Sequence, residues 1–327
     1  MRMRIKIRFL ITLLAFSLAH LAGIICPAVH AADDDARVAI TPRNAAQPKP
    51  RAAGTLRADV KLILIPATVT DPFGAPFSGL PREAFRLIED GVEQQLRYFS
   101  SDEAPISLAV VFDSSRSMEH KIEQSRAAVK RFFGTAIPGD EFLLVEFNDV
   151  PRVLCNFTSD TDRIEKTLVD IKPKNWTALL DAVYVSIRQM RHARNSRKAL
   201  LILSDGGDNN SRYTEAEMKS LVRESDVCIY SIALPGGGLI RRNERLLRQL
   251  SDETGGLACR LDRMGDLAEA VAKISAAIRN QYLLGYLSNN PDNNGLYRKI
   301  EIKLNPSPDL PRLHASWRSG YYAPDGW

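Results

Sequence analysis

From Ile106 onward, short apolar runs alternate with stretches whose apolar residues recur every three or four positions. Runs such as Lys198–Ser204 (KALLILS) are apolar almost throughout, which is typical of strands covered on both faces. The sequence therefore predicts an α/β unit, a doubly wound, mostly parallel, Rossmann-like sheet. The helices are expected at Met118, Ile122, Val129 and Phe133; at Ile164 to Val169; at Leu179, Val183, Ile187 and Met190; at Met218 to Val222; at Leu246 to Leu250; and at Leu267, Val271, Ile274 and Ile278.

One pair of strands in this unit should be antiparallel. The segments 141–147 (EFLLVEF) and 152–157 (RVLCNF) are separated only by NDVP at 148–151. A parallel crossover needs a dozen or more residues, so this connector predicts an antiparallel neighbour in the otherwise parallel sheet.

The segments on either side of the α/β unit read as short β-strands. Residues 56–101 contain three such stretches, two of them joined at Asp90-Gly91, a pair typical of tight hairpin turns. Residues 282–322 contain three more, and neither group has enough strands for a two-layer structure by itself. We expect the two groups to form one all-β sandwich that flanks the α/β unit. Its buried faces are predicted at Val60, Leu62 and Leu64 and at Ile300, Ile302 and Leu304.

The first residues have the layout of a secretory signal peptide. An apolar run from Phe9 to Ala19 precedes the small-residue site Val29-His30-Ala31, while apolar character from Leu21 to Ile25 leaves an uncleaved anchor as the alternative. No later segment is apolar and long enough to span a bilayer. The basic residues before the run are Arg2, Arg4, Lys6 and Arg8.

These features divide the chain into five parts: a signal peptide at 1–31, a flexible linker at 32–55, an N-terminal β segment at 56–103, the α/β unit at 104–281 and a C-terminal β segment at 282–327. The formal net charge of +5 falls to +1 when the four basic residues of the leader are removed, so charge gives no support for a nucleic-acid partner. Three cysteines follow the leader, each in an apolar strand-like run, which favours free thiols over disulfides: Cys155, Cys228 and Cys259.

Candidate chemistry gathers where two of the predicted strands end. Asp113, Ser115 and Ser117 follow the first strand of the α/β unit, Asp205 follows KALLILS, and Thr177 precedes a helix in NWTALLDA. Ligands of open α/β sheets bind at the carboxyl ends of strands, where we expect Asp113 to face solvent. Two carboxylates and three hydroxyls form an oxygen-only set that suits a divalent cation, Mg²⁺ first, with Mn²⁺ and Ca²⁺ as alternatives.

These residues resemble a known family. The chain from Ile106 to about Gln281 is similar to a von Willebrand factor type A domain, and DSSRS, Thr177 and Asp205 match its metal-ion-dependent adhesion site in order and setting. The resemblance implies that Ser115, Ser117 and Thr177 contact the metal, that the aspartates act largely through water, and that a partner's carboxylate completes the coordination. Asn175 stands where the family often has glycine, and asparagine tolerates left-handed geometry well. The flanks resemble a bacterial group of secreted von Willebrand factor A-related proteins.

Other interpretations of the motif have less support. Helix capping accounts for one or two residues of DSSRS but not for the threonine and aspartate at other strand-to-helix edges. A serine-hydrolase elbow lacks its glycines, since Asp113 and Ser117 stand in their places. An aspartyl-phosphate enzyme would have a second acid where Ser115 stands.

The sequence thus predicts an exported, non-enzymatic binding module, periplasmic, cell-surface or secreted. It would use a divalent cation to bind Asp or Glu of a partner protein, with no nucleic acid, no small-molecule substrate and no membrane contact beyond an uncleaved signal segment. The alternative is a structural or scaffolding protein of the cell envelope with a vestigial metal site, and a metal-assisted hydrolase ranks below both.

Overall fold

The computed structural model describes residues 62–205, 207–236, 240–305 and 310–325. The predicted signal peptide, linker and Val60 lie outside these residues. Within the described helices, none is long and apolar enough to cross a membrane.

The α/β unit is built on a six-stranded sheet with the order β10-β9-β8-β5-β6-β7. All neighbouring pairs are parallel except β6 and β7, which are antiparallel. The short connector therefore predicted the exception correctly. The strands are β5 (Ile106–Asp113), β6 (Glu141–Phe147), β7 (Pro151–Thr158), β8 (Arg197–Ser204), β9 (Cys228–Ala233) and β10 (Ala258–Arg260).

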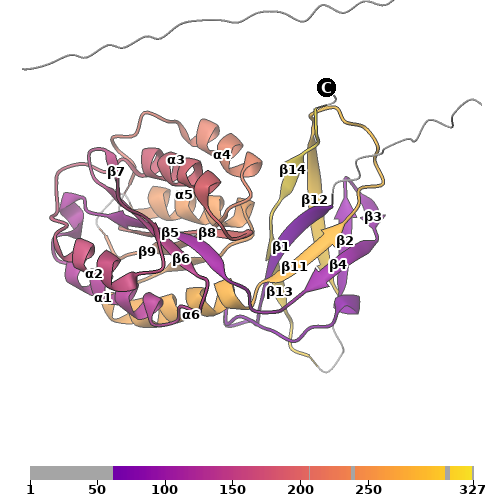
Figure 1. Ribbon diagram of the computed structural model, residues 1–327, viewed down its shortest axis with the longest axis horizontal. Helices are drawn as coiled ribbons and strands as arrows, with labels where there is room; N and C mark the ends of the chain where they lie inside the picture. Colours follow the sequence, from indigo (N-terminus) through magenta and orange to yellow (C-terminus); the bar gives the residue numbers. More distant parts are fainter. Residues whose placement is uncertain (1–61, 206, 237–239, 306–309, 326–327) are drawn as a thin grey trace, which may run out of the picture. The chain divides into compact units, whose positions relative to one another are not determined.

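Helices cover both faces of this sheet (Figure 1). On one face lie α1 (Ile122–Phe133), α2 (Thr161–Val169) and α6 (Leu267–Arg279), and on the other α3 (Leu179–Gln189), α4 (Glu215–Glu224) and α5 (Ile240–Glu253). Alternate residues of β5 enter the two cores, Leu108, Val110 and Phe112 in one and Ala109 and Val111 in the other. The strand is apolar throughout because both of its faces are buried, and the predicted fold class is confirmed.

Local sequence signals explain several helix boundaries. Thr214 caps α4, and Glu217 accepts a hydrogen bond back from the backbone N–H of Thr214, which completes a capping box. The first predicted helix is shorter than expected, because Met118 ends a separate 3₁₀ turn, Arg116–Met118, before α1 begins.

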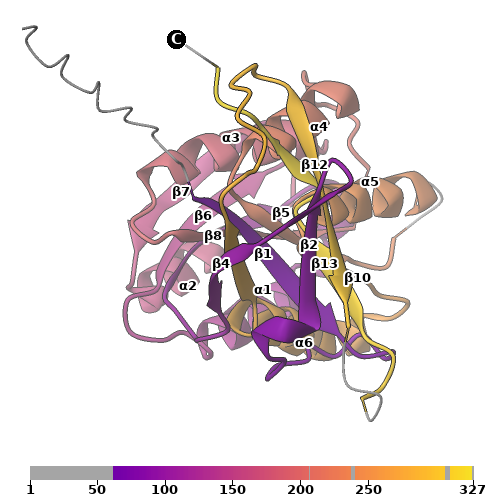
Figure 2. The same ribbon diagram turned by 90° about the vertical axis from the view of Figure 1, so that its right-hand side faces the viewer.

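The two flanks form two four-stranded antiparallel sheets, and each sheet combines strands from both flanks. Figure 2 shows the early strands, in indigo, beside the late ones, in yellow. One sheet has the order β13-β1-β11-β4, with β13 (His314–Trp317), β1 (Ile63–Thr70), β11 (Tyr282–Tyr286) and β4 (Leu96–Ser100). The other has the order β14-β12-β2-β3, with β14 (Gly320–Tyr322), β12 (Tyr297–Leu304), β2 (Phe85–Glu89) and β3 (Val92–Gln94).

The turn between β2 and β3 and the face of β12 agree with prediction. Asp90 and Gly91 have φ values of 47° and 84°, the two positive values that a tight hairpin turn of this kind requires. Ile300 and Ile302 are buried in the core that the two sheets share.

The buried face of β1, however, was predicted one residue out of register. Leu62 and Leu64 are 40% and 39% exposed, whereas Ile65, Ala67 and Val69 are fully buried. Both faces of this strand start with branched apolar residues, so alternation alone cannot decide between them, and a shift of one residue exchanges the faces. The second sheet covers the face that carries Ile65.

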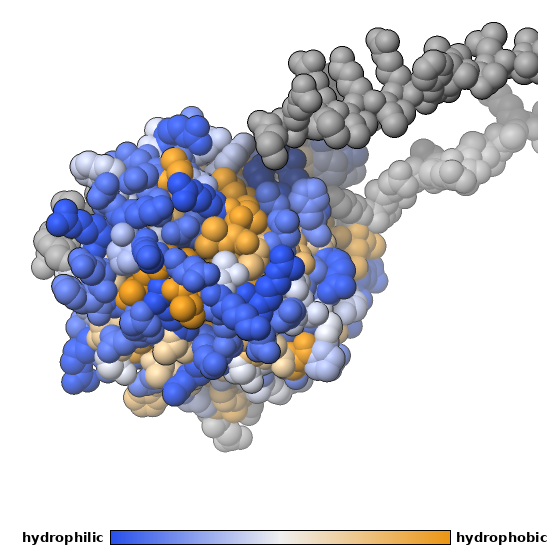
Figure 3. Space-filling model, turned by 60° about the vertical axis from the view of Figure 1, so that its left-hand side comes forward, coloured by the Kyte–Doolittle hydropathy of each residue, from blue (hydrophilic) through white to orange (hydrophobic). Residues whose placement is uncertain are grey.

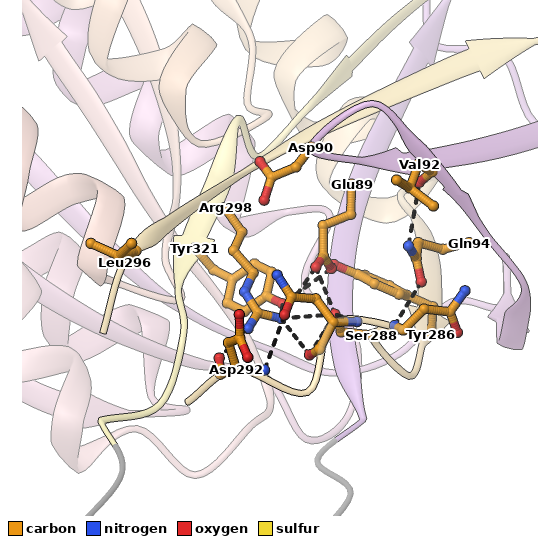
Figure 4. Close-up of polar contacts among 12 residues, drawn as sticks. Glu89, Asp90, Val92, Gln94, Tyr286, Ser288, Asp292, Leu296, Arg298 and Tyr321 are labelled. Carbon is orange, nitrogen blue, oxygen red and sulfur yellow. Dashed lines mark hydrogen bonds and ion pairs between the residues drawn. The ribbon is translucent and has the colours of Figure 1, made fainter. Parts of the chain in front are cut away.

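A buried polar cluster lies in the sandwich (Figure 4). Glu89 of β2 and Arg298 of β12 are 2% and 4% exposed, and Arg298 Nη1 lies 3.2 Å from Glu89 Oε1. The hydroxyls of Tyr286, Ser288 and Tyr321 also donate to the Glu89 carboxylate. Since β2 and β14 belong to one sheet and β11 to the other, this cluster joins the two sheets.

The three cysteines after the leader are free. Cys155 and Cys228 are buried in β7 and β9, and Cys259 is half-buried in the edge strand β10. Burial raises the pKa of the Cys228 thiol to about 11, which keeps it protonated and unreactive at neutral pH.

Candidate metal centre

The candidate site lies at the carboxyl ends of two adjacent strands, β5 and β8. Asp113 is the last residue of β5, and Asp205 directly follows β8. The chain continues from β5 to β6 on one side and places β8 on the other, so this is a point where the strand order reverses. Such switch points are where open α/β sheets bind ligands.

Four of the five predicted oxygen ligands are connected by hydrogen bonds. The backbone N–H of Ser115 donates to Asp113 Oδ1 over 2.8 Å, and the hydroxyls of Ser115 and Ser117 lie 3.1 Å apart. The Ser117 hydroxyl donates to Asp205 Oδ1 over 2.7 Å. The structure thus brings together side chains that are 88 positions apart in the sequence.

Thr177 lies in a neighbouring loop. It is buried just before α3, where its N–H donates to Asn209 Oδ1 over 2.9 Å. A bridge between Ser115 and Lys174 brings this loop beside the DSSRS segment. Among the contacts of the described residues, none joins Thr177 directly to the other four predicted ligands.

The asparagine that replaces the usual glycine causes no backbone strain. Among the described residues, Asp90 is the sole non-glycine position with positive φ, so Asn175 does not adopt left-handed geometry. The loop before Thr177 therefore forms without a glycine.

Asp113 differs from expectation because it is fully buried rather than facing solvent. Burial raises the pKa of its carboxyl to about 6, while hydrogen bonds from Ser115 and Ser204 oppose the shift. The Ser204 hydroxyl donates to Asp113 Oδ2 over 2.5 Å. Ser204 was not predicted, although its position beside Asp205 at the end of a buried strand could have indicated a supporting role.

The middle serine of the motif has a different role. Ser114 turns away from the site and donates its hydroxyl to Glu146 Oε1 over 2.8 Å. Its backbone N–H donates to the Phe147 carbonyl oxygen of the neighbouring strand β6. Ser114 therefore ties the loop to β6.

Lys121, a residue that sequence reasoning missed, contacts the site. The Lys121 ammonium, just before α1, forms an ion pair and hydrogen bond with Asp205 Oδ2. The Asp205 side chain is fully buried and that of Lys121 is 17% exposed. No local signal distinguishes this lysine from a surface residue, because its partner is 84 positions away.

The donor set fits a hard divalent cation. Its atoms are carboxylate and hydroxyl oxygens, which Mg²⁺ and Ca²⁺ prefer, and the Lys121 ammonium shows that positive charge is accommodated at Asp205. The described residues contain no group of three or more His, Cys, Asp or Glu side chains placed to hold a metal. A cation here would depend on neutral hydroxyls and would retain enough charge to attract a further carboxylate.

Comparison with known proteins identifies the family of the α/β unit. Residues 108–207 match the von Willebrand factor type A domain family. No curated protein sequence matches the chain.

Several solved structures resemble the chain at low identity. An aerotolerance-related membrane protein from Bacteroides fragilis is 19% identical, with a TM-score of 0.45, over 53% of this chain and 98% of that one. The von Willebrand factor domain of the type V pili tip protein Mfa5 from Porphyromonas gingivalis is 13% identical, with a TM-score of 0.47, over 54% and 95%. Proximal thread matrix protein 1 from the mussel byssus, with zinc in its metal-ion-dependent adhesion site, is 17% identical, with a TM-score of 0.49, over 58% and 49%.

At these identities and TM-scores the likenesses say nothing about activity or partners. The family match covers β5 from Leu108 onward, the whole DSSRS segment, Thr177 and Asp205, which are the parts of the fold that form the candidate site. This chain therefore contains a von Willebrand factor type A domain.

Proposed function

We propose that this protein is an exported, non-enzymatic binding protein that holds a divalent cation at Asp113, Ser115, Ser117, Thr177 and Asp205. When bound, the cation supplies the positive charge to which an Asp or Glu of a partner protein coordinates. Mg²⁺ is the first choice of ion, with Mn²⁺ and Ca²⁺ as alternatives. Neither nucleic acid nor a small-molecule substrate is part of the proposal.

The observation that supports this proposal most is the series of hydrogen bonds that runs from the Asp113 carboxylate through the Ser115 backbone N–H and the Ser115 and Ser117 hydroxyls to Asp205. Two buried carboxylates so close to one another are costly without a compensating cation. Lys121 provides one positive charge, and a divalent ion would provide two. Metal binding would therefore require the Lys121 ammonium to leave Asp205.

Export is supported by the predicted signal peptide. Once this peptide is cleaved, we place the mature protein in the periplasm, on the cell surface or in the medium. The same leader, if uncleaved, would anchor the protein to the membrane. The alternative function, a scaffold of the cell envelope with a vestigial metal site, has in its favour the β sandwich, which von Willebrand factor type A domains do not need for metal binding.

Calorimetric titration with Mn²⁺ and Mg²⁺ tests the proposal. Ser117→Ala is expected to weaken binding of Mn²⁺ by at least about tenfold, because it removes a predicted ligand. Ser114→Ala is the matched control, since it removes a neighbouring hydroxyl that points to Glu146 instead. Absence of binding of either ion to the unaltered protein at millimolar concentration would favour the scaffold.

A further inference from the structure

An exposed tryptophan lies directly beside the candidate metal centre. Trp176 precedes the predicted ligand Thr177, and it is 55% exposed whereas Thr177 is 4% exposed. Hydrophobic residues reach the surface elsewhere on this protein (Figure 3), so exposure alone does not mark a binding surface. The position of Trp176 and the contacts that hold its loop carry more weight.

The backbone beside Trp176 is fixed by the loop between β6 and β7. The Trp176 N–H donates to Asp149 Oδ1 over 2.9 Å, and the Asn210 side chain donates to the Asp149 carbonyl oxygen over 2.7 Å. Val150, the next residue of that loop, is 49% exposed. Two apolar side chains are thus presented to solvent on loops whose backbones are already ordered, which lowers the entropy cost of binding.

The same rim is positively charged. Arg116 of the DSSRS segment and the neighbouring Lys174 are exposed, and among the described residues neither forms an ion pair. The Lys174 N–H donates to the Ser114 carbonyl oxygen, so this lysine lies beside the DSSRS segment. Glu119 is the exposed acid nearest in sequence to Arg116. The balance of these groups favours an acidic segment over a basic one.

We infer that Trp176 and Val150 form an apolar rim that selects an acidic segment of a partner protein in which an aliphatic or aromatic residue adjoins the carboxylate. This inference rests on the proposed function, because it places that carboxylate at the metal. Tryptophan at the centre of an interface commonly contributes much of the affinity, and an exposed tryptophan otherwise exposes apolar area to water without gain. The metal would require a carboxylate from the partner, and contacts with the rim would favour those carboxylates that have an apolar neighbour.

The test uses two synthetic peptides, GSGLDLGSG and GSGSDSGSG, titrated into the purified protein and followed by NMR. Each titration is run once with Mg²⁺, which is diamagnetic and therefore compatible with NMR, and once with EDTA and no added metal. The variants are Trp176→Ala and, as matched control, Phe73→Ala, which removes an 86% exposed aromatic side chain from the β sandwich segment.

With Mg²⁺ we expect the peptide that contains Leu-Asp-Leu to bind about tenfold more tightly than the one that contains Ser-Asp-Ser. Trp176→Ala should abolish this difference, while Phe73→Ala preserves it. Equal binding of the two peptides, an unchanged preference in Trp176→Ala, or no binding of either peptide would overturn the inference.

The arm with EDTA separates this inference from the proposed function. Loss of all peptide binding on chelation supports both. A preference for the apolar peptide that persists in EDTA and still depends on Trp176 supports the rim but contradicts the metal-dependent function. Concentration-dependent self-association that Trp176→Ala abolishes would identify a second copy of the chain as the occupant and overturn the inference.

Discussion

Replacement of Arg298 by methionine should destabilise the β sandwich strongly. Arg298 is 4% exposed, and its guanidinium donates to the Glu89 carboxylate and to the carbonyl oxygens of Asn290 and Asp292 (Figure 4). Methionine fills much of the same volume but leaves Glu89 buried without an opposite charge. The carbonyl oxygens of Asn290 and Asp292 lose a donor as well.

The size of the effect follows from these contacts. Removal of one partner from a buried ion pair costs about 3–5 kcal/mol. Glu89 would keep three hydroxyl donors, from Tyr286, Ser288 and Tyr321, so the loss should lie near the lower end, about 3 kcal/mol. Urea unfolding followed by circular dichroism measures it as a lower midpoint in Arg298→Met than in the unaltered protein.

Two further variants make the result specific. Arg86→Met removes an exposed ion pair with Glu93 from the same sheet and should leave the urea midpoint nearly unchanged. The double variant Glu89→Leu, Arg298→Met removes both charges and should recover much of the stability, because an apolar pair needs no compensating charge. If Arg298→Met unfolds at the same midpoint as the unaltered protein, the buried pair does not hold the two sheets together and the reasoning is wrong.

Three more outcomes follow from the structure. Lys121→Met removes the ammonium beside Asp205, so it should tighten Mn²⁺ binding by roughly tenfold in calorimetry and destabilise the metal-free protein; weaker binding would mean that Lys121 assists the ion. Burial raises the pKa of Asp113 to about 6, so the folded protein keeps a proton that the unfolded chain releases, and stability is lost as pH rises from about 4 to 6. Asp113→Asn should remove this pH dependence and make the metal-free protein up to about 3 kcal/mol more stable at pH 7.5, measured by urea unfolding. An unchanged urea midpoint in Asp113→Asn would contradict this expectation. Deletion of residues 282–327 removes β11 to β14 from both sheets, so limited proteolysis should cut residues 62–100 while the α/β unit resists; a protected N-terminal segment would contradict the shared sandwich.

The order of elements and much of the site chemistry could be predicted from the sequence. Strand and helix periods are local, and the length of the connector 148–151 alone requires β6 and β7 to be antiparallel. The turn at Asp90-Gly91 also follows from local chemistry, because a positive φ is accessible to those residue types. The candidate oxygen ligands at the ends of β5 and β8 could be named because the carboxyl ends of parallel strands meet at one edge.

Only the tertiary structure decided which of these groups face each other. The alternation in β1 permits two registers, and the covering sheet selects the face of Ile65 over that of Leu64. Asp113 is buried because it ends β5, which lies between β6 and β8, and Lys121 meets Asp205 across 84 positions of sequence. Glu89 and Arg298 are likewise 209 positions apart. The period of apolar residues shows which positions of a strand or helix are buried. Contacts between distant residues depend instead on how separate elements pack, and no single segment of the sequence determines that packing.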